Sequence, residues 1–153
     1  MDPTPTRPRP IAICVFRKED MIFVMEGYDS RKDEVFYRPL GGTIEFGELA
    51  PQTVERELQE EIGAAVTNLR YLGVRENLFT LEGRAGHEIV LIYEGDFVDK
   101  SIYEQKAVAA QEDDGIPFTA FWKPLAEFRQ GKAPLYPEGL LELISGHDET
   151  NAP

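Results

Sequence analysis

The stretch from Gly42 to Ala64, GTIEFGELAPQTVERELQEEIGA, contains the clearest structural pattern in the chain. We predict a helix from Pro51 to Ile62 within it, because a first helical turn tolerates proline, whose missing N–H would have had no partner there. Gly63 then suits the C-terminal cap of this helix. Apolar side chains recur every four residues along the segment, at Val54, Leu58 and Ile62. That spacing predicts one apolar stripe that packs against a core.

Three glutamates of this helix are expected to share one face. Glu57, Glu60 and Glu61 stand at positions i, i+3 and i+4, which a helix places side by side. Carboxylates this close repel one another, and acids near a helix C-terminus also oppose the helix dipole. Hard divalent cations, which prefer several oxygen ligands, would compensate for this charge. The alternative is a solvated acidic face, which is the usual meaning of such a run.

The residues upstream of the glutamates extend the pattern. Five residues separate Gly42 from Glu48, seven separate Glu48 from Arg56, and the run Glu57-Leu58-Gln59-Glu60-Glu61-Ile62-Gly63-Ala64 follows. This segment resembles the Nudix box, G-x5-E-x7-R-E-U-x-E-E-x-G-U, where U is an aliphatic residue. Every fixed Gly, Glu and Arg of that motif is present at its spacing. The resemblance favours a metal site over a solvated acidic face.

The resemblance implies a fold and a reaction. Nudix enzymes have a mixed sheet between helices, and they cleave the pyrophosphate bond of a nucleoside diphosphate linked to another moiety X, with Mg2+ or Mn2+. The glutamates Glu57, Glu60 and Glu61 would hold the metal, and one of them would orient or deprotonate the attacking water. The implied substrate is a small nucleotide derivative.

The resemblance also assigns roles to neighbouring residues. Gly41 or Gly42 would offer a backbone carbonyl to the metal, or let the backbone approach the substrate. Arg56 and Glu48 would form an ion pair that braces the loop against the helix. The chain departs from the usual motif at Ala64, which is small for its aliphatic position. A second departure is Leu40, which stands between the proline and the two glycines that are often adjacent in the family.

Residues outside the motif are weaker candidates. A further metal ligand or catalytic base is expected from the acidic loop Glu112, Asp113 and Asp114, with Glu112 named first, and Glu88 is a second candidate. A solvated loop and a polar strand face are the alternatives. Substrate phosphate contacts are assigned to Arg38 and Arg75, which would otherwise pair with nearby acids. His87 and His147 are expected to be surface or structural residues, and Tyr28, Phe79 and Tyr136 are candidate stacking residues with nothing to rank them.

Composition restricts the class of protein. The chain has 153 residues, 42% of them hydrophobic, and a formal net charge of −12. Such a charge repels phosphate backbones, so stable nucleic-acid binding is not expected. No apolar run is long enough to span a bilayer, the start does not resemble a secretory signal, and the single cysteine, Cys14, excludes an internal disulfide. These features favour the cytoplasm, while a homodimer is left open.

The rest of the pattern predicts an α/β (α+β) fold with a mixed β-sheet between α-helices. We place a flexible proline-rich segment at residues 1–10, the domain at 11–146 and a polar tail at 147–153. Strands are predicted at Ile11–Arg17 and Met21–Glu26 (as a hairpin), Val35–Tyr37, Asn68–Leu81, His87–Val98 and Phe118–Trp122. Short helices are predicted at Leu125–Gln130 and Pro137–Ile144. A turn at residues 82–86 joins the two longest strands.

Three classes of function fit these features. A Nudix-type hydrolase is favoured, and a catalytically silent Nudix-fold nucleotide-binding or regulatory module is disfavoured because the motif is intact. An acidic interaction domain with the same spacing by coincidence would show no metal dependence. The identity of the nucleoside and of X depends on residues scattered over the other strands and loops, beyond the reach of the motif.

Overall fold

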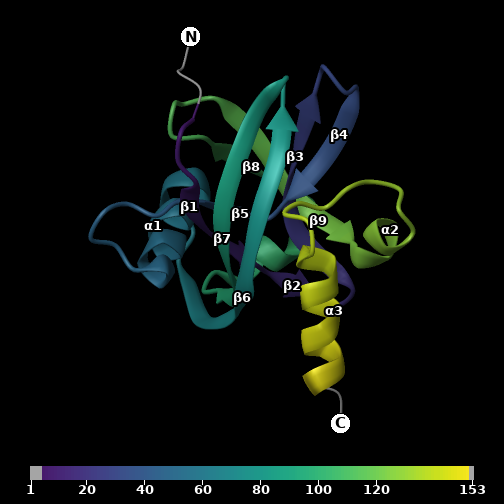
Figure 1. Cartoon of the computed structure of the whole chain (residues 1–153). Helices are drawn as coiled ribbons and strands as arrows, with labels where there is room; N and C mark the ends of the chain where they lie inside the picture. Colours follow the sequence, from purple (N-terminus) through teal and green to yellow (C-terminus); the bar gives the residue numbers. More distant parts are fainter. Residues whose placement is uncertain (1–4, 152–153) are drawn as a thin grey trace.

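The computed structural model describes residues 5–151, with the side chains of residues 5–146. The strands are β1 (Arg9–Val15), β2 (Arg17–Lys18), β3 (Met21–Asp29), β4 (Glu34–Arg38), β5 (Leu40–Thr43), β6 (Val66–Leu81), β7 (Arg84–Phe97), β8 (Ala107–Gln111) and β9 (Pro117–Pro124). The helices are α1 (Ala50–Ile62), η1 (Lys100–Glu104, a 3-10 helix), α2 (Leu125–Arg129) and α3 (Leu140–Asn151). Figure 1 shows α1 on one side of the strands and α2 with α3 on the other. The predicted mixed α+β fold is confirmed.

The strands form two sheets where we expected one. The first has the order β5-β1-β7-β6, in which only β1 and β7 are parallel. The second has the order β2-β3-β9-β8, and β4 pairs with residues 25–29 of β3. One core contains residues of both sheets together with α2 and α3, and a second core, beneath α1, also contains residues of both sheets.

The predicted hairpin between the first two strand segments forms only next to its turn, where Phe16 and β2 pair with the start of β3. β1 itself pairs with β5 and β7. The reason is burial on both faces of β1. Ile11, Ile13 and Val15 belong to the core that includes α2 and α3, while Ala12 and Cys14 belong to the core beneath α1. A strand buried on both faces is best placed in the middle of a sheet, and β1 has a neighbouring strand on each side.

The helix of the Nudix-like motif forms as predicted. α1 begins one residue early, at Ala50, and ends at Ile62. Gly63 adopts φ 66°, the left-handed conformation that closes a helix, and its N–H bonds to the Gln59 carbonyl at 2.9 Å. Val54 and Leu58 are fully buried against Ala12 and Cys14. The apolar stripe therefore fixes which face of α1 turns toward the sheet.

Other boundaries differ from expectation. The sequence did not predict β8 or η1. For β8 the reason is composition, because Ala107-Val108-Ala109-Ala110 has no marked β propensity. The turn between β6 and β7 is shorter than predicted, with only Glu82 and Gly83 between the strands, both at positive φ as tight hairpin turns require. β1 starts at Arg9, inside the segment assigned as flexible, and α3 continues to Asn151, inside the assigned tail.

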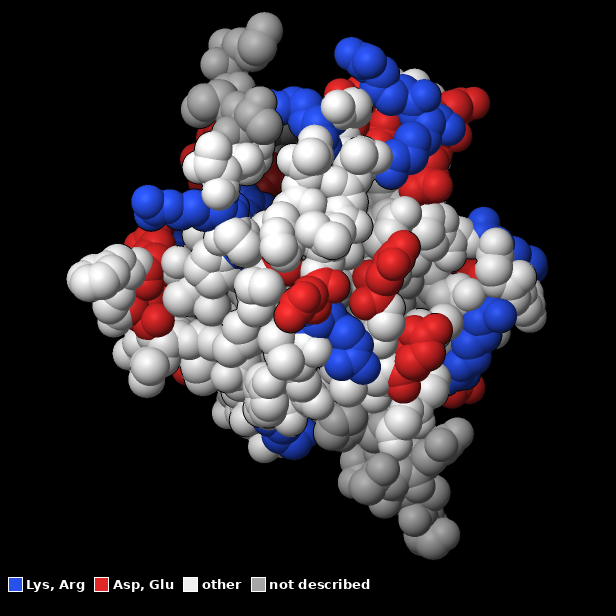
Figure 2. Space-filling model, in the orientation of Figure 1, with Lys and Arg blue, Asp and Glu red and all other residues white. Residues whose placement is uncertain are grey.

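The surface shows no single-sign patch on the face of Figure 2, where acidic and basic side chains are interspersed over a largely uncharged area. β6 forms the edge of its sheet and exposes Tyr71, Val74 and Leu78. Within residues 5–151, no helix is both long and apolar enough to cross a membrane.

Candidate active site

Two of the three helix glutamates are buried. Glu57 is 3% exposed and Glu61 is 7% exposed, whereas the side chain of Glu60 is 46% exposed. The carboxyl groups of Glu57 and Glu61 share a hydrogen bond. Burial is the main reason that the pKa values of both groups are raised. A buried carboxylate without adequate counter-charge is strongly disfavoured. With both groups ionised, this part of α1 would carry more negative charge than the chain itself neutralises.

Gly42 makes room for the buried carboxylate of Glu57. A Cβ atom at this position would lie 2.4 Å from Glu57 Cδ, so no other residue fits without displacing that side chain. Gly41 is equally confined, since a Cβ atom there would lie 2.1 Å from the Ala12 carbonyl oxygen on β1. The paired glycines thus bring the β5 backbone against both β1 and the glutamate cluster.

Arg56 connects the loop before α1 to the glutamates. Its Nε and Nη2 donate to the two carboxylate oxygens of Glu48 at 2.8 and 2.9 Å, and Nη2 also donates to the Thr43 carbonyl at 3.0 Å. Its Nη1 donates to Glu57 at 2.9 Å and to Glu60 at 3.3 Å. The Arg56 hydrogen bonds, with one from Thr53, lower the pKa of Glu48 to about 2. The sequence motif indicated the pair with Glu48 but not the direct contact with Glu57.

We expect Arg56→Ala to lower both stability and activity. The change leaves Glu48 and the Thr43 carbonyl without their guanidinium partner and frees Glu57 to move. Thermal unfolding should show a fall in Tm of about 5 °C or more at pH 7. Because the folded-state pKa of Glu48 is depressed, the pair's contribution is present above its ordinary pKa of 4.5 and should be lost as pH falls toward about 2. Arg31→Ala, at an exposed site, is the control, and an unchanged Tm in Arg56→Ala would contradict the bracing role.

The acidic loop after β8 divides into three different environments. Carboxylate oxygens of Asp113, Glu57 and Glu60 lie within 4.8 Å of one another, an arrangement that could hold a metal ion. The charge of Glu112 raises the pKa of Glu61, and Glu112 also lines a cavity. Asp114 instead accepts a hydrogen bond from the Ile116 amide at 3.0 Å, which stabilises the turn. Asp113 is thus the loop residue that groups with Glu57 and Glu60, whereas the charge of Glu112 acts on Glu61.

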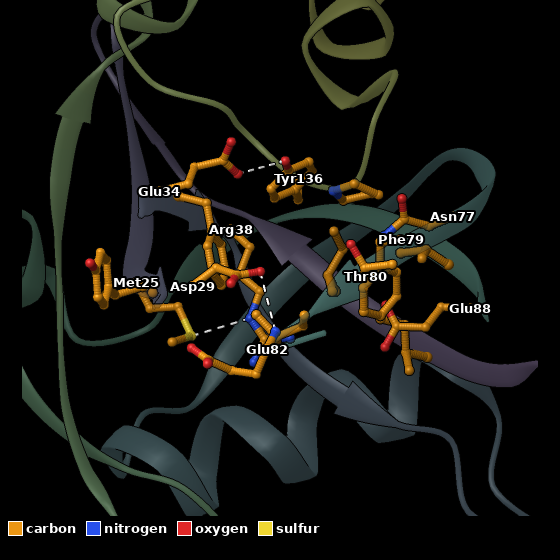
Figure 3. Close-up of a pocket in the computed structure, with 18 of the residues that line it drawn as sticks. Met25, Asp29, Glu34, Arg38, Asn77, Phe79, Thr80, Glu82, Glu88 and Tyr136 are labelled. Carbon is orange, nitrogen blue, oxygen red and sulfur yellow. Dashed lines mark hydrogen bonds between the residues drawn. The ribbon is translucent and has the colours of Figure 1, made fainter. Parts of the chain in front are cut away.

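A cavity of about 440 Å³ lies beside the glutamate cluster. In Figure 3, Met25, Glu34 and Arg38 from β3 and β4 form one side, and residues of β6 and β7 form the other. Arg38 donates its Nε to the Met25 sulfur at 3.3 Å, a weak partner for a guanidinium. Its charge lowers the pKa of Glu61. Arg38 and Glu112 therefore belong both to the cavity and to the surroundings of the glutamates.

The structure does not bring every candidate together. Arg75 lies outside the cavity, where it donates to the Val74 carbonyl and packs beside Gly139, because the chain leading into α3 covers this end of β6. Glu88 is buried in the cavity wall and pairs with Arg9 at 2.6 Å. His87 lies one residue along β7, on the opposite face. The side chain of His147 falls outside the described residues.

Comparison with known proteins decides the family. A family model described as NUDIX domain matches residues 6–142, nearly the whole chain. The chain belongs to the Nudix family. Solved structures agree on the Nudix fold: a NUDIX hydrolase from Nitrosomonas europaea superimposes with a TM-score of 0.66 at 19% identity, covering 94% of this chain and 90% of that one. A protein described as an ADP compounds hydrolase gives 0.59 at 16% identity, covering 95% and 77%.

Curated relatives resemble this Nudix chain over a shorter stretch. A NAD-capped RNA hydrolase NudC from Pseudomonas aeruginosa is 34% identical over 70 residues, which cover 46% of this chain and 23% of the relative. Its counterpart from Vibrio vulnificus is 38% identical over 64 residues, covering 42% and 24%. The match spans about a quarter of the length of these relatives. It agrees with the family and leaves the activity and the substrate open.

Proposed function

We propose that this Nudix protein hydrolyses the pyrophosphate bond of a nucleoside diphosphate linked to a second moiety, with Mg2+ or Mn2+ as cofactor. The observation that carries the proposal is the cluster of Glu57, Glu60 and Asp113 beside the cavity that contains Arg38. The relatives add support, since NAD-capped RNA and ADP compounds, named for two of them, are both nucleotide derivatives.

The residues present fit a hard divalent cation. The donors are carboxylate oxygens, and two of the glutamates are buried and share a hydrogen bond, whose proton a divalent cation could replace. Glu57, Glu60 and Glu61 would hold the metal with Asp113, and Gly41 would add a carbonyl. Bound there, the metal would polarise phosphoryl oxygens and lower the pKa of a water molecule.

The chain's own groups orient the substrate. Arg38 has only a thioether as a hydrogen-bond partner within the described residues, so its guanidinium can turn toward a phosphate at little cost. Arg56, held by Glu48 and Thr43, keeps Glu57 in place. Glu112, which lines the cavity and whose charge acts on Glu61, is our candidate to accept a proton from the attacking water.

A panel of nucleoside diphosphate derivatives tests the proposal. The whole chain would be incubated with Mg2+ and nucleotide sugars, dinucleotides and nucleoside triphosphates, and the products separated by chromatography. We expect at least one compound to be cleaved within its pyrophosphate, to give a nucleoside monophosphate and phosphorylated X. Binding of these compounds without any cleavage would instead favour the silent nucleotide-binding module.

The general base can be identified by four substitutions. We expect Glu112→Gln to lower kcat by about 100-fold or more at saturating substrate, with the metal requirement unchanged, because proton acceptance is lost. Asp113→Asn should raise the Mg2+ concentration needed for half-maximal rate, since it removes a ligand charge. Asp114→Asn and Glu88→Gln should retain kcat, because these residues bond to the turn and to Arg9. Near wild-type turnover in Glu112→Gln would place the base on α1.

A further inference from the structure

Three adjacent strands place polar side chains in a row on the cavity wall. Asn77 on β6 lies opposite Glu88 on β7, and Glu88 lies opposite Arg9 on β1. All three residues line the cavity, and Asn77 and Glu88 are each only 7% exposed. Figure 3 shows Asn77 and Glu88 on the same side of the cavity, across from Met25. Polar groups buried at this depth in a sheet normally have partners.

The hydrogen-bonding capacity of this row is incompletely used. Arg9 Nη2 donates to Glu88 Oε2, which leaves Glu88 Oε1 as a free acceptor. The carboxamide of Asn77 makes no hydrogen bond to any residue whose side chain or backbone the structure describes. The Asn77 amide and Glu88 Oε1 are not among the buried atoms that lack a partner, so they face the cavity, where a ligand that bonds to both would replace water. The row thus presents one carboxylate acceptor beside a group that both donates and accepts.

The two sides of the cavity are lined by phenylalanine rings held against glycines. Phe36 on β4 lies over Gly27, and Phe79 on β6 lies over Gly86, each pair being directly opposed across strands. A Cβ atom on Gly27 or Gly86 would approach the facing ring to within 2.3 or 2.2 Å. Because Gly27 and Gly86 have no side chain, each phenylalanine ring packs directly on the backbone of the neighbouring strand. This packing keeps the space between the two rings open. Aromatic faces of this kind suit a planar heterocycle.

We propose that Asn77 and Glu88 bind the edge of the substrate's base and select bases with an exocyclic amino group (adenine, guanine or cytosine) over uracil and thymine. This inference rests on the proposed function. An amino group donates to the Glu88 carboxylate, and the neighbouring ring nitrogen or carbonyl bonds to the Asn77 amide. In uracil and thymine the single ring N–H lies between two carbonyl oxygens, whose lone pairs face the carboxylate.

The test compares nucleotides that differ only in the base. ADP-glucose, GDP-glucose, CDP-glucose and UDP-glucose share one X, so their kcat/KM values with the whole chain and Mg2+ report base selection. We expect at least one amino-bearing substrate to exceed UDP-glucose by about tenfold or more, as for one charge-assisted hydrogen bond. Asn77→Leu, of similar size, should remove most of this ratio by raising KM, with kcat within about twofold. Glu76→Leu, at an exposed site on the same strand, should keep the ratio.

Binding of nucleoside monophosphates separates this inference from the proposed function. Dissociation constants of AMP, GMP, CMP and UMP, measured by calorimetry, require no catalysis. If no sugar nucleotide is cleaved but an amino-bearing monophosphate binds tightly and Asn77→Leu weakens it, the hydrolase proposal fails and the inference stands. Equal affinity for UMP and the other three, equal kcat/KM for UDP-glucose, or a ratio unchanged by Asn77→Leu would overturn the inference. So would the absence of saturable binding by every monophosphate.

Discussion

Hydrolysis by this protein is expected to stop completely in excess chelator and to return on addition of Mg2+ or Mn2+. Glu57 and Glu61 are buried with raised pKa values, and Asp113 adds a further carboxylate. Without a cation these groups repel each other and the substrate's phosphates alike. The measurement is the release of nucleoside monophosphate at increasing Mg2+, after dialysis against chelator.

Thermal unfolding gives a second measurement that needs no substrate. The proposed metal site exists only in the folded chain. Saturating Mg2+ should therefore raise Tm. Glu57→Gln should reduce this rise, while Glu55→Gln, an exposed position on the same helix, should leave it intact. Full turnover in excess chelator, on any substrate, would exclude the metal-dependent mechanism.

Glu60→Gln and Glu61→Gln are each expected to lower kcat by about 100-fold or more. Each removes one ligand charge from the proposed metal site without changing the size of the side chain. For Glu61, burial raises the pKa to about 9, so the metal-free side chain is protonated at neutral pH and the neutral glutamine should leave the stability of the metal-free protein unchanged. A loss of activity without a loss of stability would separate a catalytic role from a structural one.

The matched control for both variants is again Glu55→Gln, which changes the net charge of α1 by the same amount. It should keep nearly the full rate, because its side chain is exposed. Retention of more than half the wild-type rate by both Glu60→Gln and Glu61→Gln would show that the assigned roles are wrong.

The sequence by itself determined α1 and the relative positions of its glutamates. Helix spacing follows from backbone geometry, so Glu57, Glu60 and Glu61 share a face wherever the helix packs. Pro51 and Gly63 act through their own backbone, which is why the helix limits were predictable to within one residue. The partnership of Arg56 with Glu48 was likewise accessible from the motif, and the structure contains it.

Only the tertiary structure decided what surrounds those glutamates. The burial of Glu57 depends on Gly42 of β5, and β5 is placed by its pairing with β1, a partner that no local pattern identified. The approach of Asp113, the separation of Arg75 from the cavity and the row Asn77–Glu88–Arg9 all depend on which strands are neighbours. Strand pairing is set by contacts between distant residues that bury β1 on both faces. Periodicity along the chain records which residues are buried, but not against which partner.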